Sequence, residues 1–270
     1  MISFLKADPP AWLRDSDSAR YIRAVEVADG SALDPGVRDA ITNFIVGCKR
    51  DGIWNAIKAS CILTGARTLA GALIPLKGAA PTNFNFVSGD YNRKTGLIGD
   101  GSTKYLDSNR NNNEDPQNSQ HLAFSVSTAS SVGGANALYG GSSSESPFTG
   151  VRIGRAATTG ALFARHNSTA ADIFSAPITG SETGLIGSAR SNGANYTLRV
   201  GSGSTVVTRA SVAPVDANLG VFCGIVGGTN TTTEYSNARL AFYSIGGSLD
   251  LALLDARVTT LINTFASTIP

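Results

Sequence analysis

Apolar side chains recur at helical spacing near the start of the chain and again at its end. The firmest early helix begins at Asp34-Pro35, an N-cap residue followed by proline at the first helical position, and ends near Asp51-Gly52. Its apolar face carries Val37, Ile41, Phe44, Ile45 and Cys48. Shorter helices are predicted over residues 18–28, 53–59 and 68–73. Short loops between neighbouring helices favour an antiparallel helical cluster.

From residue 83 the pattern changes to short strands set among Gly, Ser, Thr and Asn. Residues 83–87 alternate between polar and apolar, as a half-buried strand does. A second short strand is predicted at 104–107, and we expect the two to form the first hairpin. Further strands are predicted over 122–127, 137–140, 151–154, 161–165, 172–174, 184–189, 196–200, 205–208, 221–226 and 238–245. Asn192-Gly193 and Ser202-Gly203 are typical turn pairs between alternating segments.

The fold class that follows is mainly β, an antiparallel β-sandwich with an N-terminal helical head and a C-terminal helix. No sustained helical period interrupts the strands, which excludes an alternating β/α fold. The last helix presents one apolar face, with Leu251, Leu254, Val258, Leu261, Ile262 and Phe265. We therefore divide the chain into an arm and helical head over 1–80 and a sandwich with its terminal helix over 81–270.

Composition narrows the classes of function. The chain has 270 residues, 42% of them hydrophobic, and a net charge of +2, without the clustered basic excess that tracks nucleic acid. No apolar run approaches the ~20 residues that span a bilayer, so no membrane insertion is predicted. Cys48, Cys61 and Cys223 are an odd count without a CxxC pair, and we expect three buried thiols in a protein made in a reducing cytoplasm.

Catalytic motifs are missing from the sequence. The histidines are His121 and His166, far apart and each in a strand-like context, where a structural role is the more common one. Neither a Gly-x-Ser-x-Gly elbow nor a phosphate-binding glycine loop occurs. The closely spaced acidic pattern of sandwich glucanases is also absent. The sequence thus predicts a protein that is not an enzyme.

The most oxygen-rich loop of the chain spans residues 107–117, DSNRNNNEDPQ. Carboxylate and amide oxygens are the ligands that calcium prefers. If this loop binds a metal, we expect calcium at Asp107, Asn111 and Asp115. A solvated loop ended by the Asp115-Pro116 turn is the favoured alternative, and no other cofactor is indicated.

Aromatic side chains in the β region supply candidate platforms for a ligand. Rings stack on the CH faces of sugars, and this region carries Tyr105, Tyr139, Phe148, Tyr196 and Tyr235. Of these, the four tyrosines are the candidate ligand-binding residues. The same rings would serve equally well in a core or in an oligomer interface.

The first fourteen residues carry Phe4, Leu5, Trp12 and Leu13 between prolines, without a helical or strand pattern that would bury them. Leaving such side chains in water costs ~1.5–3 kcal/mol each. We expect a neighbouring chain to cover them, which makes a homo-oligomer or a larger array the predicted state. Folding of the arm back over its own helices is the alternative.

Two stretches carry a family resemblance. They are residues 45–54, IVGCKRDGIW, and 95–106, TGLIGDGSTKYL, and the closing stretches 239–246 and 248–254 extend the match. The chain resembles structural proteins of tailed bacteriophages, particularly cyanophages and other marine phages, that carry a concanavalin A-like (laminin G-like) sandwich. The resemblance implies a jelly-roll fold and a virion component, and it assigns no catalytic or binding residue.

Two hypotheses about function remain open. The first is a non-enzymatic structural protein of the tail, fibre or capsid surface that assembles with other virion proteins. The second is a carbohydrate-binding module that recognises a glycan on the host surface. The observation that separates them is whether an exposed sheet face carries a concave, aromatic-lined groove.

Overall fold

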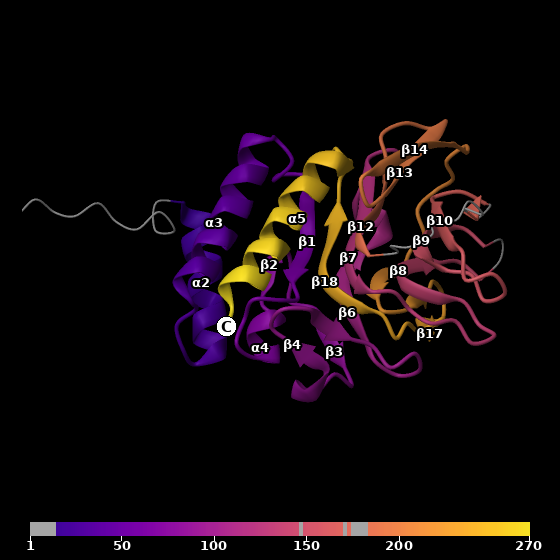
Figure 1. The fold of residues 1–270 in the computed structure, drawn as a ribbon. Helices are drawn as coiled ribbons and strands as arrows, with labels where there is room; N and C mark the ends of the chain where they lie inside the picture. The colour runs from indigo at the N-terminus through magenta and orange to yellow at the C-terminus, as the bar shows by residue number, and fades with distance from the viewer. Residues whose placement is uncertain (1–14, 146–147, 170–171, 174–182) are drawn as a thin grey trace, which may run out of the picture.

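The computed structural model describes residues 15–145, 148–169, 172–173 and 183–270. Its strands form two stacked sheets, and helices cover the outer face of one of them (Figure 1). The helices are α2 (Ser16–Asp29), α3 (Pro35–Arg50), α4 (Leu69–Ala72) and α5 (Leu251–Thr268). The molecule is therefore built in three layers, namely helices, a first sheet and a second sheet.

The first sheet, called sheet A, has nine strands. Its main path runs through β14 (Gly203–Thr208), β13 (Asn195–Val200), β12 (Gly184–Arg190), β7 (Gln120–Thr128), β18 (Arg239–Gly246), β1 (Ile57–Ile62) and β2 (Pro75–Lys77). β5 (Gly96–Ile98) pairs with β18 and with β4 (Tyr91–Asn92). The pairings of this sheet are antiparallel.

The second sheet, called sheet B, also has nine strands. Its main path runs through β11 (Asp172–Ile173), β10 (Leu162–His166), β9 (Gly150–Arg155), β8 (Ala137–Ser143), β15 (Asn218–Val221), β6 (Tyr105–Asn111) and β3 (Thr82–Phe84). The hairpin of β16 (Gly224–Val226) and β17 (Thr231–Thr233) joins it through a parallel pairing of β16 with β8. The predicted fold class, a mainly β sandwich with N-terminal helices and a C-terminal helix, is confirmed.

Alternation along the strands of sheet A separates two hydrophobic cores. On β7, Leu122, Phe124 and Val126 belong to the core between the sheets, whereas Ala123 belongs to the core under the helices. On β18, Tyr243 faces the other sheet, while Phe242 packs edge-on against Phe44 of α3, with 5.7 Å between the ring centroids. Because successive side chains of a strand point to opposite faces, one sheet supplies both cores.

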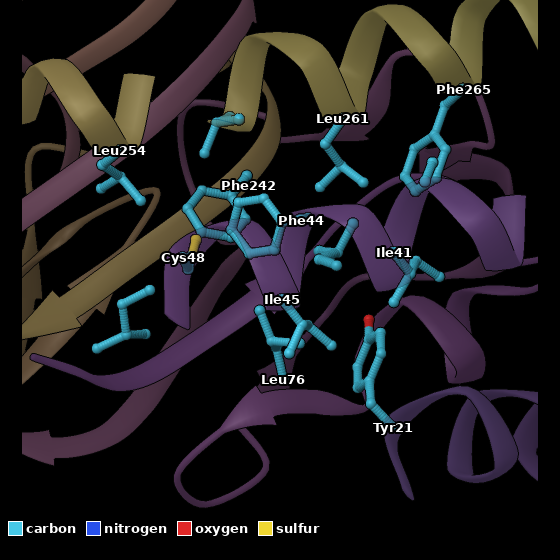
Figure 2. Packing of buried hydrophobic residues seen from close by; sticks show 14 of the residues in the cluster. Tyr21, Ile41, Phe44, Ile45, Cys48, Leu76, Phe242, Leu254, Leu261 and Phe265 are labelled. Carbon is cyan, nitrogen blue, oxygen red and sulfur yellow. The ribbon is translucent and has the colours of Figure 1, made fainter. Parts of the chain in front are cut away.

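The core under the helices joins the two ends of the chain. Figure 2 shows Leu254, Leu261 and Phe265 of α5 above the rings of Phe44 and Phe242. α5 lies against both α3 and β12. Its first turn is capped by Asp250, whose carboxylate accepts the backbone N–H of Ala252 at 2.7 Å. The predicted burial of the terminal helix is confirmed.

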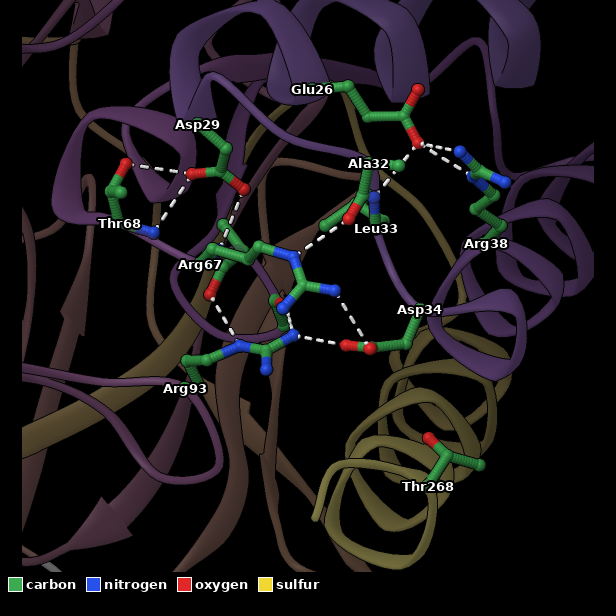
Figure 3. A network of polar contacts seen from close by, with 12 residues as sticks. Glu26, Asp29, Ala32, Leu33, Asp34, Arg38, Arg67, Thr68, Arg93 and Thr268 are labelled. Carbon is green, nitrogen blue, oxygen red and sulfur yellow. Dashed lines mark hydrogen bonds and ion pairs between the residues drawn. The ribbon is translucent and has the colours of Figure 1, made fainter.

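A polar network fastens the helical head to the loops of sheet A (Figure 3). Asp34 accepts hydrogen bonds from Arg93 at 2.5 Å and from Arg67 at 2.9 Å, and these contacts hold the pKa of its carboxyl below the ordinary value. Asp29 accepts from the hydroxyl of Thr68 at 2.7 Å. The head is thus held by charge-assisted hydrogen bonds as well as by apolar packing.

The predicted secondary structure of two segments is wrong. Residues 53–59 were expected to form a helix, but β1 begins at Ile57, because β18 and β2 supply hydrogen-bond partners on either side. A short apolar run fits a buried strand as well as a helix, and its neighbours decide between them. Residues 221–226 were expected to form one strand, but the chain reverses at Phe222, which has a φ of 71°, and forms β15 and β16.

β1 and β2 lie within the first eighty residues but belong to sheet A. The division of the chain into a head and a sandwich at residue 80 stays a prediction. Phe174 at the end of a predicted strand lies outside the described residues, as do Phe4, Leu5, Trp12 and Leu13. Within the described ranges, no helix has both the length and the apolar character needed to cross a bilayer.

Candidate functional site

A groove of about 550 Å³ opens on the outer face of sheet B. Strands β3, β6, β15, β16 and β17 and the turn between the last two surround it. Its lining consists of Phe84, Tyr105, Asp107, Asn111, Asp216, Ala217, Asn218, Ile225, Gly228, Asn230 and Thr232. The groove therefore combines aromatic, acidic and amide side chains from segments far apart in the sequence.

Strand periodicity places the lining residues. Leu106 is fully buried between the sheets, so its neighbours Tyr105 and Asp107 point the other way, into the groove. Pairing of β3 with β6 sets Phe84 opposite Tyr105, and pairing of β15 with β6 sets Gly220 opposite Asp107. The two strands of the predicted hairpin do pair and form one wall of the groove, but β4 and β5 of sheet A lie between them in the chain, so they are not a hairpin.

The aromatic wall is a stacked pair of rings. The ring centroids of Phe84 and Tyr105 are 4.3 Å apart with 4° between their planes, and Tyr235 meets Tyr105 edge-on at 6.0 Å. Tyr235 in turn is hydrogen-bonded through its hydroxyl to Thr232. Burial raises the pKa of Tyr105, so its phenol stays neutral. Phe84 remains 37% exposed, which leaves ring surface for a ligand.

The polar wall is a pair of carboxylates held by amides. Asp216 accepts the side-chain N–H groups of Asn111 at 2.8 Å and Asn113 at 3.2 Å, both on Oδ1. Asp107 accepts from the side chain of Asn218 at 3.1 Å on Oδ2 and from the backbone N–H of Asn109 at 2.8 Å on Oδ1. These bonds fix the orientation of both carboxylates before any ligand arrives.

The floor of the groove is apolar at Ala217 and Ile225, which belong to a small buried cluster with Val215 and Cys223. The reversal at Phe222 positions it, since β15 before this residue and β16 after it both pair with β8. Phe222 is buried against Phe86 with ring centroids 5.0 Å apart, and its backbone N–H donates to Tyr139 O at 2.8 Å. Packing thus holds a bulky residue in the left-handed region, where it costs energy.

The structure divides the four candidate tyrosines. Tyr105 lines the groove, whereas Tyr235 contacts the ring of Tyr105 edge-on but is not one of the lining residues. Tyr139 and Tyr196 are 0% and 1% exposed in the core between the sheets, and the hydroxyl of Tyr196 donates to Ala164 O at 3.2 Å. We therefore withdraw Tyr139 and Tyr196 from the candidate site, since neither presents a ring to solvent. Phe148 is exposed but does not line the groove.

The three candidate calcium ligands are not gathered in one place. Asp107 and Asn111 line the groove, whereas the buried carboxylate of Asp115 is paired with Arg110 at 2.8 Å. The side-chain oxygen of Asn111 also accepts the backbone N–H of Asn113 at 3.1 Å. Among the described residues no group of three or more His, Cys, Asp or Glu side chains is arranged to hold a metal. These side chains do not fit a shared calcium ion, and we assign the groove no metal chemistry.

Sequence reasoning missed most of the groove. Phe84 was seen as part of a strand but not as a platform, and Asp216, Asn218, Asn230 and Thr232 were not singled out. The hydrogen bond from Asn111 to Asp216 spans 105 positions of the chain, so no local pattern reveals it. The only available signal was the run of Asn and Thr around residues 229–233, which is typical of a surface turn.

Both histidines are buried away from the groove. The ring of His121 is hydrogen-bonded to Gly247 O at 2.6 Å and to Ser244 Oγ at 2.7 Å, and burial lowers its pKa to about 4. His166 contacts Ser188 Oγ at 2.8 Å, and burial together with the charge of Arg190 lowers its pKa. Both rings are neutral at pH 7 and are hydrogen-bonded to neighbouring residues of the fold, and neither is part of the groove.

Comparison with known proteins adds only distant likenesses of fold. No protein-family model and no curated protein matches the sequence. Trypanosoma rangeli sialidase in complex with 2,3-difluorosialic acid is 12% identical with a TM-score of 0.45, over 93% of this chain and 38% of the sialidase. Tailspike protein 2 of the Escherichia coli O157:H7 bacteriophage CAB120 is 10% identical with a TM-score of 0.38, over 70% of this chain and 27% of the tailspike.

The chain spans less than two fifths of the length of either protein. With TM-scores under 0.5, these likenesses assign no residue and carry no argument about function. The candidate site therefore depends on the geometry of this chain alone.

Proposed function

We propose that this chain is a non-catalytic carbohydrate-binding module of a phage particle and that a saccharide binds in the groove on sheet B. The observation that carries the proposal is the stacked pair of Phe84 and Tyr105 facing oriented carboxylates and amides over an apolar floor. Ligand sites commonly combine apolar and aromatic lining with a few polar groups that fix orientation. Host-surface attachment and assembly are the two roles that the module would serve.

The two walls suit the two kinds of surface on a sugar ring. The CH face of a pyranose is apolar and would lie on the aromatic wall, where Phe84 offers exposed ring surface. Ring hydroxyls would donate to the carboxylates of Asp107 and Asp216 and would accept from nearby amide N–H groups such as that of Asn230. Charge-assisted hydrogen bonds of this kind are stronger than neutral ones.

The contents of the groove support binding without hydrolysis. A glycosidase needs one carboxyl group that protonates the leaving oxygen and a second that acts as base or nucleophile. The groove holds two carboxyl groups, Asp107 and Asp216, and the hydrogen bonds to each of them come from N–H donors. Neither histidine borders the groove. The enzyme status of the chain is part of the proposal and is open to assay.

The proposed setting is a virion whose parts are made in the host cytoplasm. Its support is the resemblance of residues 45–54 and 95–106 to structural proteins of tailed phages. Residues 95–106 also end in Tyr105 and Leu106, so the resembling stretch runs into the wall of the groove. Other virion proteins and further copies of the chain are the proposed partners, and a host-surface glycan is the proposed ligand.

The test is binding of the purified chain to a printed array of bacterial polysaccharides. We expect specific binding by the unaltered protein and a roughly two- to tenfold loss of affinity in Phe84→Ala, the range that an aromatic contact supports. Phe148→Ala removes an exposed ring outside the groove and should leave binding unchanged. Absence of binding to any glycan, or equal losses in the two variants, would contradict the proposal.

A further inference from the structure

The groove is acidic on one wall and carries no positive charge. Asp107 and Asp216 are the charged side chains that line it, and within the described ranges no Lys, Arg or His borders it. The whole chain has a net charge of +2, so the acidity of the groove is a local property. An anionic ligand would meet like charge in a partly enclosed space, where screening by water is weaker than at an open surface.

A nearby cation does not neutralise this wall. Arg110 lies on the same strand, β6, but its guanidinium is paired with Glu114 at 2.8 Å and with Asp115 at 2.8 Å. The groups that contact Asp107 and Asp216 are amide N–H groups, which orient a carboxylate without cancelling its charge. The repulsion of an anion therefore remains when the local network is complete.

This wall keeps free hydrogen-bond acceptor capacity. An ionised carboxylate has about four acceptor sites on its two oxygens. Both hydrogen bonds to Asp216 fall on Oδ1, and Oδ2 has no partner in the described part of the chain. A sugar hydroxyl can donate to such an oxygen, whereas the carboxylate of an acidic sugar has no proton to offer at neutral pH.

We infer that the groove selects uncharged saccharides and rejects acidic ones, with Asp107 and Asp216 as the residues that determine this specificity. The inference rests on the proposed carbohydrate-binding function and names the class of ligand for that site. Neutral hexoses and their uncharged derivatives would satisfy both walls. Sugars that carry a sialic acid, a uronic acid or a sulfate would bring like charge to the two carboxylates.

The experiment uses a printed array in which each neutral oligosaccharide stands beside its sialylated or uronic-acid counterpart. We expect the unaltered chain to bind neutral members and to bind their acidic counterparts at least tenfold more weakly. In Asp107→Asn and Asp216→Asn this difference should shrink at least threefold. Asp39→Asn is the matched control, since Asp39 is exposed on α3, outside the groove, and the difference should stay as it was.

A second measurement needs no variant. Raising the NaCl concentration screens repulsion between the groove and an acidic sugar, so the ratio of neutral to acidic binding should fall with salt in the unaltered chain. Equal or tighter binding of acidic members, with binding still reduced in Phe84→Ala, would overturn this inference and leave the carbohydrate-binding function standing. Failure to bind any member would overturn both.

Discussion

Buried ionisable residues show what the sandwich interior requires of a side chain. His121 and His166 lie in the interior as neutral rings, each hydrogen-bonded to a serine hydroxyl. Arg190 is fully buried and satisfied by backbone carbonyls, including His166 O at 2.8 Å. Polar residues are tolerated here because partners replace the water that burial removes.

The buried histidines predict a dependence of stability on pH. An unfolded histidine takes up a proton near pH 6.5, whereas burial holds the pKa of folded His121 at about 4 and also lowers that of His166. The unfolded chain thus binds more protons between these values, and the free energy of unfolding should fall as pH decreases from about 6.5 toward 4. The expected slope is up to about 1.4 kcal/mol per pH unit for each histidine.

Urea denaturation of the unaltered chain and of His121→Gln between pH 7 and pH 4 measures this effect. The variant cannot titrate at that position, so its stability should decline less steeply with falling pH than that of the unaltered chain. Carboxylates titrate in both proteins and cancel in the difference. Parallel slopes would show that His121 does not contribute.

At the scale of elements, α5 is the main link between the helical layer and sheet A. Leu254 and Leu261 are 0% and 1% exposed and lie in the core that also contains Phe44 and Phe242. Arg257 adds a bidentate contact with Asp51 beyond the end of α3, at 2.6 and 2.9 Å. Asp255 of α5 is also paired with Arg199 of β13 at 2.7 Å, so apolar packing and two ion pairs fix the helix at several points along its length.

Truncation of this apolar face should be costly. Leu254→Ala or Leu261→Ala should lower the free energy of unfolding by about 2–5 kcal/mol, because each leaves a cavity as well as losing apolar contact. Leu253→Ala is the control, since Leu253 is 37% exposed on the same helix, and its loss should stay within about half a kcal/mol. Losses below about half a kcal/mol in both buried variants would contradict the packing of α5.

At the scale of the whole molecule, sheet A joins segments from both ends of the chain. β18 is paired with β1 from the first quarter of the sequence and with β7 from its middle. α5 follows β18 directly and lies against α3. The described helices and sheet A therefore share one of the two hydrophobic cores, and sheet B lies on the other side of sheet A from the helices (Figure 1).

The prediction for assembly concerns residues 1–14, which lie outside the described residues. Because Phe4, Leu5, Trp12 and Leu13 form an apolar segment, we expect the chain to work as a homo-oligomer or in a larger array held partly by this segment. Deletion of residues 1–14 should lower the mass measured in solution by light scattering. The variant Phe84→Ala is the control and should keep the full mass, and an unchanged mass after the deletion would contradict the prediction.

The parts of the fold that could be predicted are those set by interactions between residues close together in the sequence. The helices α2, α3 and α5 and most strands were found because capping residues and periodicity are local signals, as with Asp34-Pro35 at the start of α3. β1 was mistaken for a helix because its identity depends on β18, far away in the sequence. The reversal at Phe222 was missed because tertiary packing, not a turn signal, holds its backbone.

The sequence by itself determined that this protein combines a β-sandwich with helices, because alternating and helical patterns of apolar residues indicate which faces are buried. It also marked Tyr105, Tyr235, Asp107 and Asn111 as chemically suited to a site. Only the tertiary structure decided that Tyr105, Asp107 and Asn111 share one groove with Phe84 and Asp216, and that Tyr235 contacts Tyr105 without lining the groove. It also decided that Tyr139 and Tyr196 belong to the core. The reason is physical: burial follows from local pattern, whereas a site requires side chains from distant strands to meet, and strand order is settled only when the two sheets pack.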